Sequence, residues 1–353
     1  MSKLRNMASA WSARISLLAL LGLAVPCHAV TPLPFTPNNP LGGAPIGFAY
    51  AGNKFVGTIL DNGTGQNLLY STNLTGTGVT PFAPAVILNP NYGQEHYVSS
   101  SLGLGGFPNR DVYVASGNNI DHISNTGTPL GLVVGGSGLG INGDVRGITF
   151  DAVGTFGYNM IVTTHTGYVY KIDNAGNPTQ LAYTGEDTEG LDIAPVGPGA
   201  HWGSLDGALF VASEGTGTVR AIKPTNAPGS PGTTVAFVPS AEQLDFVPLN
   251  LGASGSPLEG MYSANYALDV LKAPYTDFTG YLGDIIVTGE TTSAISRVNA
   301  PFSVSNVGSF PNQPEDGLFV TAAIIAGADT PEPATLGLLV TGGLALLGRR
   351  RRA

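Results

Sequence analysis

Acidic side chains recur in front of a repeated apolar segment, and they have the clearest potential for chemistry in this chain. The acids at these points are Glu95, Glu189, Glu259, Glu315 and Asp316. Arg146 takes the same place in front of another copy, and His96 lies next to Glu95. If the segments are equivalent strands around one axis, these side chains converge at the mouth of a channel. Carboxylates held together in this way repel one another unless a cation or the arginine balances them. Oxygen ligands of this kind suit Ca²⁺, which is the one cofactor that the pattern indicates.

Two other interpretations of the same residues stay open. Each Glu-Gly or Asp-Gly pair also fits a turn that leaves its carboxylate in water. Alternatively, a cation held by the carboxylates polarises an ester or lactone carbonyl in a catalytic site, which also requires a general base. His96 is the histidine to test for that role because it accompanies Glu95.

Other catalytic signatures are absent from the sequence. It contains no His-Glu-x-x-His, Gly-x-Ser-x-Gly, Ser-x-x-Lys or P-loop motif. Its single cysteine, Cys27, precedes the body of the chain, so a disulfide framework or thiolate metal site is excluded there. We therefore name no catalytic residue, and the sequence favours a binding protein over an enzyme.

The elements that position these residues are hairpins that repeat along the chain. Each hairpin has an apolar strand, a tight polar turn and an alternating strand, and the copies cover residues 111–123, 159–172, 208–222 and 284–298, with a looser copy over 54–70. Equivalent valines at 114, 162 and 211 are 48 and 49 residues apart. A period near fifty with three or four strands per unit is typical of a β-propeller.

The acid-led segments are the predicted inner strands of this propeller. They cover residues 146–150, 189–193, 259–262 and 315–325. The last one has no hairpin after it, and the first hairpin has no clear inner strand before it, so the two ends of the body are expected to complete one blade. We predict an all-β fold with a single propeller of five blades, or six if the insertion over 244–281 hides another. The body resembles six-bladed propellers of the NHL-like and lactonase-like types.

The charge of the body narrows the choice of partners. Residues 30–330 contain eight basic and 23 acidic residues, a formal charge of −15, whereas the whole chain has −9. Such a surface repels phosphate backbones, so nucleic acid is not an expected partner. Dissolved cations or neutral glycans are the expected partners.

The first 29 residues have the pattern of a secretory signal peptide. Basic residues precede an apolar run over 15–25, and Cys27-His28-Ala29 offers small residues for cleavage after Ala29. A lipoprotein signal centred on Cys27 is the alternative, but Pro26 does not fit it. Signal peptidase is thus the first expected processing enzyme.

The last two dozen residues have the pattern of a second targeting signal. An apolar stretch over 334–348 is shorter than a typical membrane span, and four arginines follow it. The residues of the motif are Pro331, Glu332, Pro333, Arg349, Arg350, Arg351 and Arg352. This arrangement closely resembles the PEP-CTERM sorting signal of Gram-negative bacteria that make exopolysaccharide. An ordinary single-span anchor is the alternative.

The resemblance implies recognition by exosortase, a membrane-embedded transpeptidase-like enzyme, and removal of the tail. The expected domains are a signal peptide over 1–29, a propeller over 30–329 and a sorting signal with a short transmembrane helix over 330–353. The chain is expected to cross the inner membrane, stay anchored briefly, and reach the cell surface or medium. Its expected function is non-catalytic binding associated with exopolysaccharide or biofilm. The alternative is a cation-dependent hydrolase or lactonase with its site in the channel.

Overall fold

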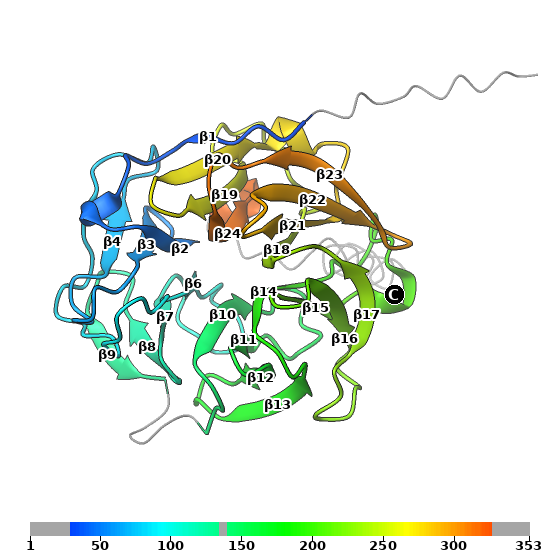
Figure 1. Cartoon of the computed structure of the whole chain (residues 1–353), viewed down its shortest axis with the longest axis horizontal. Helices are drawn as coiled ribbons and strands as arrows, with labels where there is room; N and C mark the ends of the chain where they lie inside the picture. Colours follow the sequence, from blue (N-terminus) through cyan, green and yellow to red (C-terminus); the bar gives the residue numbers. More distant parts are fainter. Residues whose placement is uncertain (1–28, 134–139, 327–353) are drawn as a thin grey trace, which may run out of the picture.

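Six small β-sheets are arranged in a ring around a central axis, as the end-on view in Figure 1 shows, and we call the space along this axis the channel. The computed structural model describes residues 29–133 and 140–326. Each sheet has four antiparallel strands, so the body is a six-bladed β-propeller. Six is the higher of the two blade counts that the sequence predicts.

Blades one to four are each built from four strands that follow one another in the chain and run from the channel outward. The strands of blades one and two are β2 (Pro45–Tyr50), β3 (Phe55–Ile59), β4 (Leu69–Thr72), β5 (Thr80–Pro81), β6 (Val98–Ser100), β7 (Val112–Ser116), β8 (Asn119–Ile123) and β9 (Pro129–Leu132). Those of blades three and four are β10 (Val145–Phe150), β11 (Met160–Thr164), β12 (Tyr168–Ile172), β13 (Pro178–Tyr183), β14 (Thr188–Ile193), β15 (Leu209–Ser213), β16 (Thr218–Ile222) and β17 (Thr233–Phe237).

Blades five and six depart from this simple order. Blade five contains β18 (Ala241–Phe246), β21 (Ile285–Gly289), β22 (Ala294–Asn299) and β23 (Ser303–Ser309). Between β18 and β21 the chain leaves to form a hairpin, β19 (Gly260–Asn265) and β20 (Val270–Pro274), which is the middle of blade six. The inner strand of blade six is β24 (Pro314–Val320), and its outer strand is β1 (Leu33–Pro34). The insertion over 244–281 therefore contains half of the sixth blade.

This order corrects three expectations. The segment after Glu259 is β19, the second strand of blade six, and the inner strand of blade five is β18. β24 does have a hairpin, which precedes it in the chain as β19 and β20. The first hairpin, β3 and β4, also has its own inner strand, β2. The first two mistakes came from assuming that every later blade is continuous in sequence, and the third came from overlooking β2 as an inner strand.

The second strand of a blade is its most completely buried element. β3, β7, β11, β15 and β21 are buried at every position, because neighbouring blades cover both of their faces. Their sequences are rich in β-branched, aromatic and small apolar residues, which suit a strand covered on both sides. Outer strands such as β9 are exposed at every residue. The core therefore lies in layers between the blades.

The N-terminal residues of the body complete blade six. Leu33 and Pro34 of β1 pair with β20, and the Val30 N–H donates to the Val307 carbonyl at 2.7 Å. Phe35 packs edge-on against Phe55 and Tyr262, with ring centroids 5.2 and 4.8 Å apart. The predicted closure is thus present, although β1 and β24 occupy opposite edges of one sheet and do not pair with each other.

Short helices complete the described structure. They are the 3₁₀ segments η1 (Pro40–Gly42), η2 (Gly203–Leu205) and η3 (Tyr275–Phe278) and the helix α1 (Ala322–Ala326). Within residues 29–133 and 140–326, no helix has the length and apolar character needed to cross a membrane. The predicted signal peptide up to residue 28 and the sorting helix over 334–348 lie outside the described residues.

Candidate functional site

One mouth of the channel carries a ring of charged residues at the beginnings of inner strands. Arg146, Glu189, Glu242 and Glu315 are the second residues of β10, β14, β18 and β24, and Glu95 lies shortly before β6. We call these five residues the charged ring. Four of them are among the predicted channel residues, and the structure adds Glu242.

Glycines next to the ring allow the inner strands to come close together. A Cβ on Gly147 would lie 2.2 Å from the Glu189 carbonyl oxygen, and one on Gly190 would lie 2.1 Å from that of Glu242. Both glycines are inside strands. The Glu189-Gly190 pair is therefore part of β14, where the sequence also allowed a turn.

Arg146 is the cation of the ring. Its guanidinium forms an ion pair with Glu95 through Nη1, and its Nη2 and Nε lie 3.6 and 3.5 Å from Asp187 and Glu189. These carboxylates, Glu189 foremost, raise the pKa of Arg146 against the opposing effect of burial. A charged arginine thus neutralises part of the acidic cluster.

Tyr97 joins two glutamates from different blades. Its hydroxyl donates to Glu189, and the same oxygen lies 3.0 Å from Glu242 Oε1. A hydroxyl has only one hydrogen to donate, so Tyr97 cannot donate to both glutamates at once. Glu242, when protonated, donates its single hydrogen to Glu189. The two carboxyl groups therefore share a proton.

Burial changes the ionisation of this mouth. It raises the pKa of Glu189 to about 7, and it holds the pKa values of Glu242 and Glu315 well above their usual range, with the Glu189 charge adding to both. The amide Nε2 of Gln313 donates to Glu315 at 2.9 Å and also to Glu290, whose pKa burial raises to about 8. Several of these acids are thus neutral near pH 7.

A three-carboxylate group lies beside the ring. One oxygen each from Asp187, Glu189 and Glu214 lies within 4.8 Å of the other two. Carboxylate oxygens at this separation suit a hard cation such as Ca²⁺. Arg146 contacts two of the three, however, so its positive charge already occupies the neighbourhood. The three carboxylates are therefore a candidate cation site, where the Arg146 guanidinium would compete with a metal ion.

Glu259 and His96, which were predicted to face the channel, do not face it. Glu259 is fully buried behind the sixth blade, where its carboxylate accepts hydrogen bonds from the Gly252 and Ala322 N–H groups at 3.1 and 2.9 Å. Its role is to fasten a loop and α1. The segment assignment that placed it in the channel was wrong, as described above.

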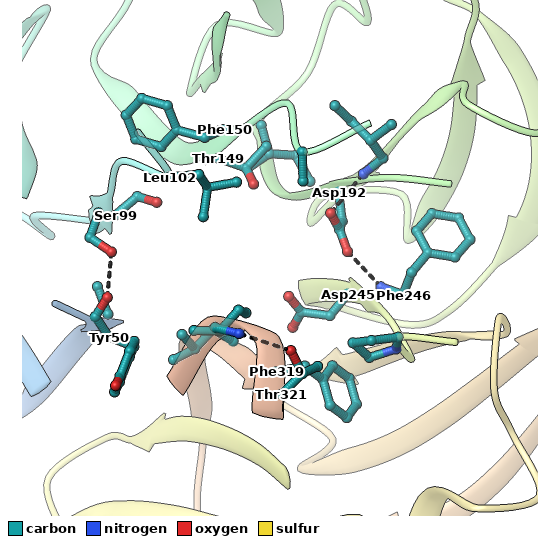
Figure 2. Close-up of a pocket in the computed structure, with 18 of the residues that line it drawn as sticks. Tyr50, Ser99, Leu102, Thr149, Phe150, Asp192, Asp245, Phe246, Phe319 and Thr321 are labelled. Carbon is teal, nitrogen blue, oxygen red and sulfur yellow. Dashed lines mark hydrogen bonds between the residues drawn. The ribbon is translucent and has the colours of Figure 1, made fainter. Parts of the chain in front are cut away.

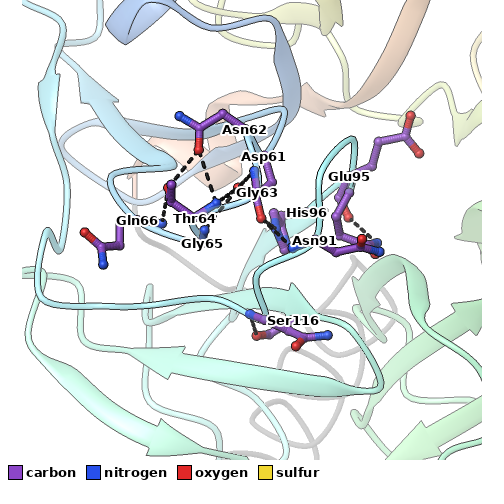
Figure 3. Close-up of polar contacts among 12 residues, drawn as sticks. Asp61, Asn62, Gly63, Thr64, Gly65, Gln66, Asn91, Glu95, His96 and Ser116 are labelled. Atoms are coloured by element: carbon purple, nitrogen blue, oxygen red, sulfur yellow. Dashed lines mark hydrogen bonds and ion pairs between the residues drawn. The ribbon is translucent and has the colours of Figure 1, made fainter.

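His96 points away from the channel, as Figure 3 shows beside Glu95. Its Nδ1 donates to the Ala115 carbonyl at 2.8 Å, and its Nε2 lies 3.9 Å from Asp61. Burial lowers the pKa of His96, so the ring is neutral. Residues one apart in extended chain face opposite sides, which is why Glu95 and Tyr97 reach the channel and His96 does not.

The opposite mouth opens into a cavity of about 550 Å³, drawn in Figure 2. All six inner strands contribute to its wall. Its polar floor contains Asp192, Asp245 and Asp316, and aromatic side chains such as Phe150 and Phe319 stand around it. Asp316 was predicted for the other mouth, whereas Asp192 and Asp245 were not predicted at all.

A β-bulge explains how one strand serves both mouths. In β14, Thr188 pairs with Ser213 and Leu191 with Val211, so three steps on one strand match two on its neighbour. β18 has the same irregularity between Ala241 and Leu244. The extra residue changes the alternation, so that residues three apart reach the channel side. Glu189 and Asp192 thus lie at successive levels of the channel.

A repeated pattern in the sequence could have revealed the missed residues. Glu189-Gly-Leu-Asp192 and Glu242-Gln-Leu-Asp245 have the same acid spacing and the same leucine. A search keyed on Glu-Gly and Asp-Gly pairs overlooks the second copy. Tyr97 had no such signal, because it comes from a blade with a different inner sequence.

Burial also raises the pKa values of the carboxyl groups in the cavity. Asp192 accepts hydrogen bonds from the Ile193 and Phe246 N–H groups at 2.7 and 2.8 Å, yet burial raises its pKa to about 6. Burial raises the pKa of Asp316 to about 8 and that of Asp245 well above its usual range, with the Asp192 charge adding to the latter. Such an apolar pocket with a few convergent polar groups is the usual form of a ligand site.

The sequence comparisons identify the tail of the chain. Residues 329–352 match the family described as the PEP-CTERM protein-sorting motif. The chain therefore carries this motif, which implies an exported cell-envelope protein that exosortase processes. These residues lie outside the described structure. None of the curated proteins compared with the chain matches it.

Solved structures with a similar fold are distant in sequence. A provisionally assigned gluconolactonase has 10% identity and a TM-score of 0.52, with 81% of this chain and 84% of that chain covered. A streptogramin B lyase has 14% identity and a TM-score of 0.43 over 80% of this chain and 75% of that one. A virginiamycin B lyase from Staphylococcus aureus with quinupristin has 14% identity and a TM-score of 0.45, covering 81% and 77%. At these identities the likeness shows the propeller fold alone.

Proposed function

We propose that the propeller is a non-catalytic binding module of the cell envelope, associated with exopolysaccharide or biofilm. Its ligand binds in the cavity formed by the ends of the six inner strands. The observation that carries this proposal is the contrast between the two mouths. The charged ring is internally paired through Arg146 and Tyr97, whereas the cavity presents three carboxyl groups in an apolar wall of ligand-binding size.

The route to the envelope is part of the proposal. Signal peptidase removes residues 1–29, and the 330–353 segment anchors the chain in the inner membrane until exosortase cuts the tail. Val30, the residue that follows this cut, belongs to the propeller, because its N–H donates to the Val307 carbonyl at 2.7 Å. Mass spectrometry of the exported protein tests both steps. An N-terminus other than Val30, or a retained tail, contradicts them.

A cation-dependent hydrolase or lactonase is the second candidate. The proximity of Asp187, Glu189 and Glu214 favours it, because these oxygens could hold Ca²⁺ beside the channel. His96, which the sequence offered as the histidine to test, faces Asp61 and Ala115 outside the ring. The three carboxylates could therefore hold a cation, but His96 is not placed to act as the general base beside it.

One set of measurements separates the two candidates. Thermal unfolding of the purified protein with Ca²⁺ and with chelator reports cation binding, and a panel of esters and lactones reports turnover. The variant Glu214→Gln removes one candidate ligand, and Asp173→Asn serves as a control in the outer turn between β12 and β13. Calcium-dependent turnover that is lost in Glu214→Gln would establish the hydrolase. Glycan binding without turnover, lost in Asp245→Asn, supports the binding module.

A further inference from the structure

We propose that the cavity binds an organic ligand that presents a primary ammonium group on a ring-shaped or partly apolar body. The inference rests on the proposed binding function and deepens it, because it names the ligand chemistry of the same cavity. It follows from the composition of the floor and walls and from one unpartnered buried amide.

The floor brings three carboxyl groups together. Asp192 and Asp245 end equivalent stretches of neighbouring inner strands, and Figure 2 shows them on the same side of the cavity. Asp316 of β24 lines the cavity as well, and its charge adds to that of Asp192 in raising the pKa of Asp245. A cation among these groups would relieve both their burial and their mutual repulsion.

A second observation points to a missing hydrogen-bond donor. The Gln243 side chain is 3% exposed, and its amide Nε2 donates to Asp245. Its Oε1 has no hydrogen-bond partner in the described part of the chain. The amide lies next to a residue of the cavity wall, because a Cβ on Gly317 would lie 2.9 Å from Gln243 Nε2. A buried acceptor without a donor is costly, and an ammonium group carries three donors.

The side chains of the cavity wall indicate the chemistry of the part of the ligand that does not carry the ammonium group. Phe150, Phe246 and Phe319 border the cavity, and aromatic faces stabilise both apolar rings and adjacent cations. Ser99 and Thr149 add hydroxyl groups to the lining, and these suit hydroxyls on a sugar ring. A hexosamine with a free amino group therefore fits the same chemistry as a simple aromatic amine.

The cavity also contains one basic residue, Arg110. It lies over the Tyr50 ring at 5.4 Å and donates from Nη2 to the Ile324 carbonyl at 2.9 Å. The remaining titratable groups that face the cavity are Tyr50 and Tyr158. The ammonium group is expected among the three aspartates of the floor.

Paired probes test the charge requirement by calorimetry on the purified protein. We expect phenethylamine to bind at least about tenfold more tightly than 2-phenylethanol, which has the same ring and no charge. Amine binding should also release protons near pH 7, because a bound cation lowers the raised pKa values of the floor. Equal affinities, or amine binding without proton release, would overturn the proposal.

Variants locate the ammonium group. Asp245→Asn should weaken phenethylamine binding by about tenfold or more, and Gln243→Met by a smaller factor, because each removes an acceptor. Asp144→Asn should leave the affinity unchanged. Thermal unfolding confirms that each variant is folded. Unchanged affinity in a folded Asp245→Asn protein contradicts the assignment.

Two glycan probes separate this inference from the proposed function. A glucosamine oligomer should bind, and its N-acetylated counterpart should bind at least about tenfold more weakly. If the N-acetylated oligomer binds and neither amine does, the ammonium inference fails and the binding module stands. If phenethylamine alone binds, the inference stands and the association with glycans fails. If no probe binds, both fail.

Discussion

The Tyr97 hydroxyl donates a hydrogen bond to Glu189 across the channel, although the two residues are 92 positions apart. The same hydroxyl contacts Glu242, so three inner-strand regions meet at one oxygen. Each of these side chains is at most 4% exposed. Their protonation and their contacts should therefore affect the stability of the whole propeller.

Removal of this hydroxyl should destabilise the protein. Tyr97→Phe leaves two buried carboxyl groups with one donor fewer, and we expect a loss of about 1–3 kcal/mol in the free energy of unfolding. Tyr70→Phe is the matched control, because the buried Tyr70 hydroxyl has no partner among the described residues. Denaturant titration of both variants measures the difference. Equal stability of the two would contradict the role of Tyr97.

The protein should be more stable at mildly acidic than at alkaline pH. The pKa of Glu189 rises from 4.5 to about 7 and that of Glu290 to about 8, so the folded state holds protons more tightly than the unfolded state. The resulting stabilisation is complete below the ordinary pKa and is lost as pH rises through 7 to 8. One pKa unit corresponds to about 1.4 kcal/mol.

Thermal unfolding between pH 5 and pH 9 measures this dependence. We expect the midpoint to fall across that range and to fall less in Glu242→Gln, which cannot ionise. A midpoint that rises through the same range shows that the buried carboxyl groups are already ionised in the folded protein.

Arg146 should be essential to the fold at neutral pH. Arg146→Met leaves Glu95, Asp187 and Glu189 without their cation, and breaking a buried pair in this way costs about 3–5 kcal/mol. Lower pH should restore part of the loss, because the carboxyl groups then become neutral. Lys223→Met removes a partly exposed cation outside the ring as the control, and chemical denaturation at pH 5 and pH 8 compares the two variants. A loss that does not depend on pH argues for packing alone.

Glu259 should matter for stability and leave ligand binding unchanged. Glu259→Gln disturbs a carboxylate that accepts from Gly252, Ser256 and Ala322 N–H groups, and we expect a loss of about 1–3 kcal/mol. The affinity of the cavity ligand should stay within experimental error of the unaltered protein. An altered affinity in a folded variant shows that the loop around Glu259 contributes to the site.

Phe35 tests the closure of the ring of blades. Phe35→Ala removes the ring that packs on Phe55 and Tyr262, and we expect about 2–4 kcal/mol of destabilisation. Leu33→Ala is the control, since Leu33 is 59% exposed on the same strand segment. Comparable effects of the two substitutions on the unfolding free energy contradict a closing role for Phe35.

The sequence by itself determined the propeller and the sorting motif, because both depend on local patterns. Hairpins such as 159–172 repeat at a nearly constant interval, and the tail motif is continuous over 329–352. The sequence analysis also identified four of the five residues of the charged ring. Arg146, Glu189 and Glu315 are the second residues of their strands and Glu95 lies shortly before its own, so each stands at the start of an apolar segment that is visible in the sequence.

Tertiary structure decided the order of the last two blades and the composition of both mouths. The sixth blade takes its hairpin from inside the fifth, so the positions of Glu259 and Glu242 depend on strand pairing between distant segments. Bulges in the inner strands change the alternation, which places Asp192 and Asp245 at the cavity. Pairing and bulges arise from contacts between strands, and a periodicity read along one strand does not contain them.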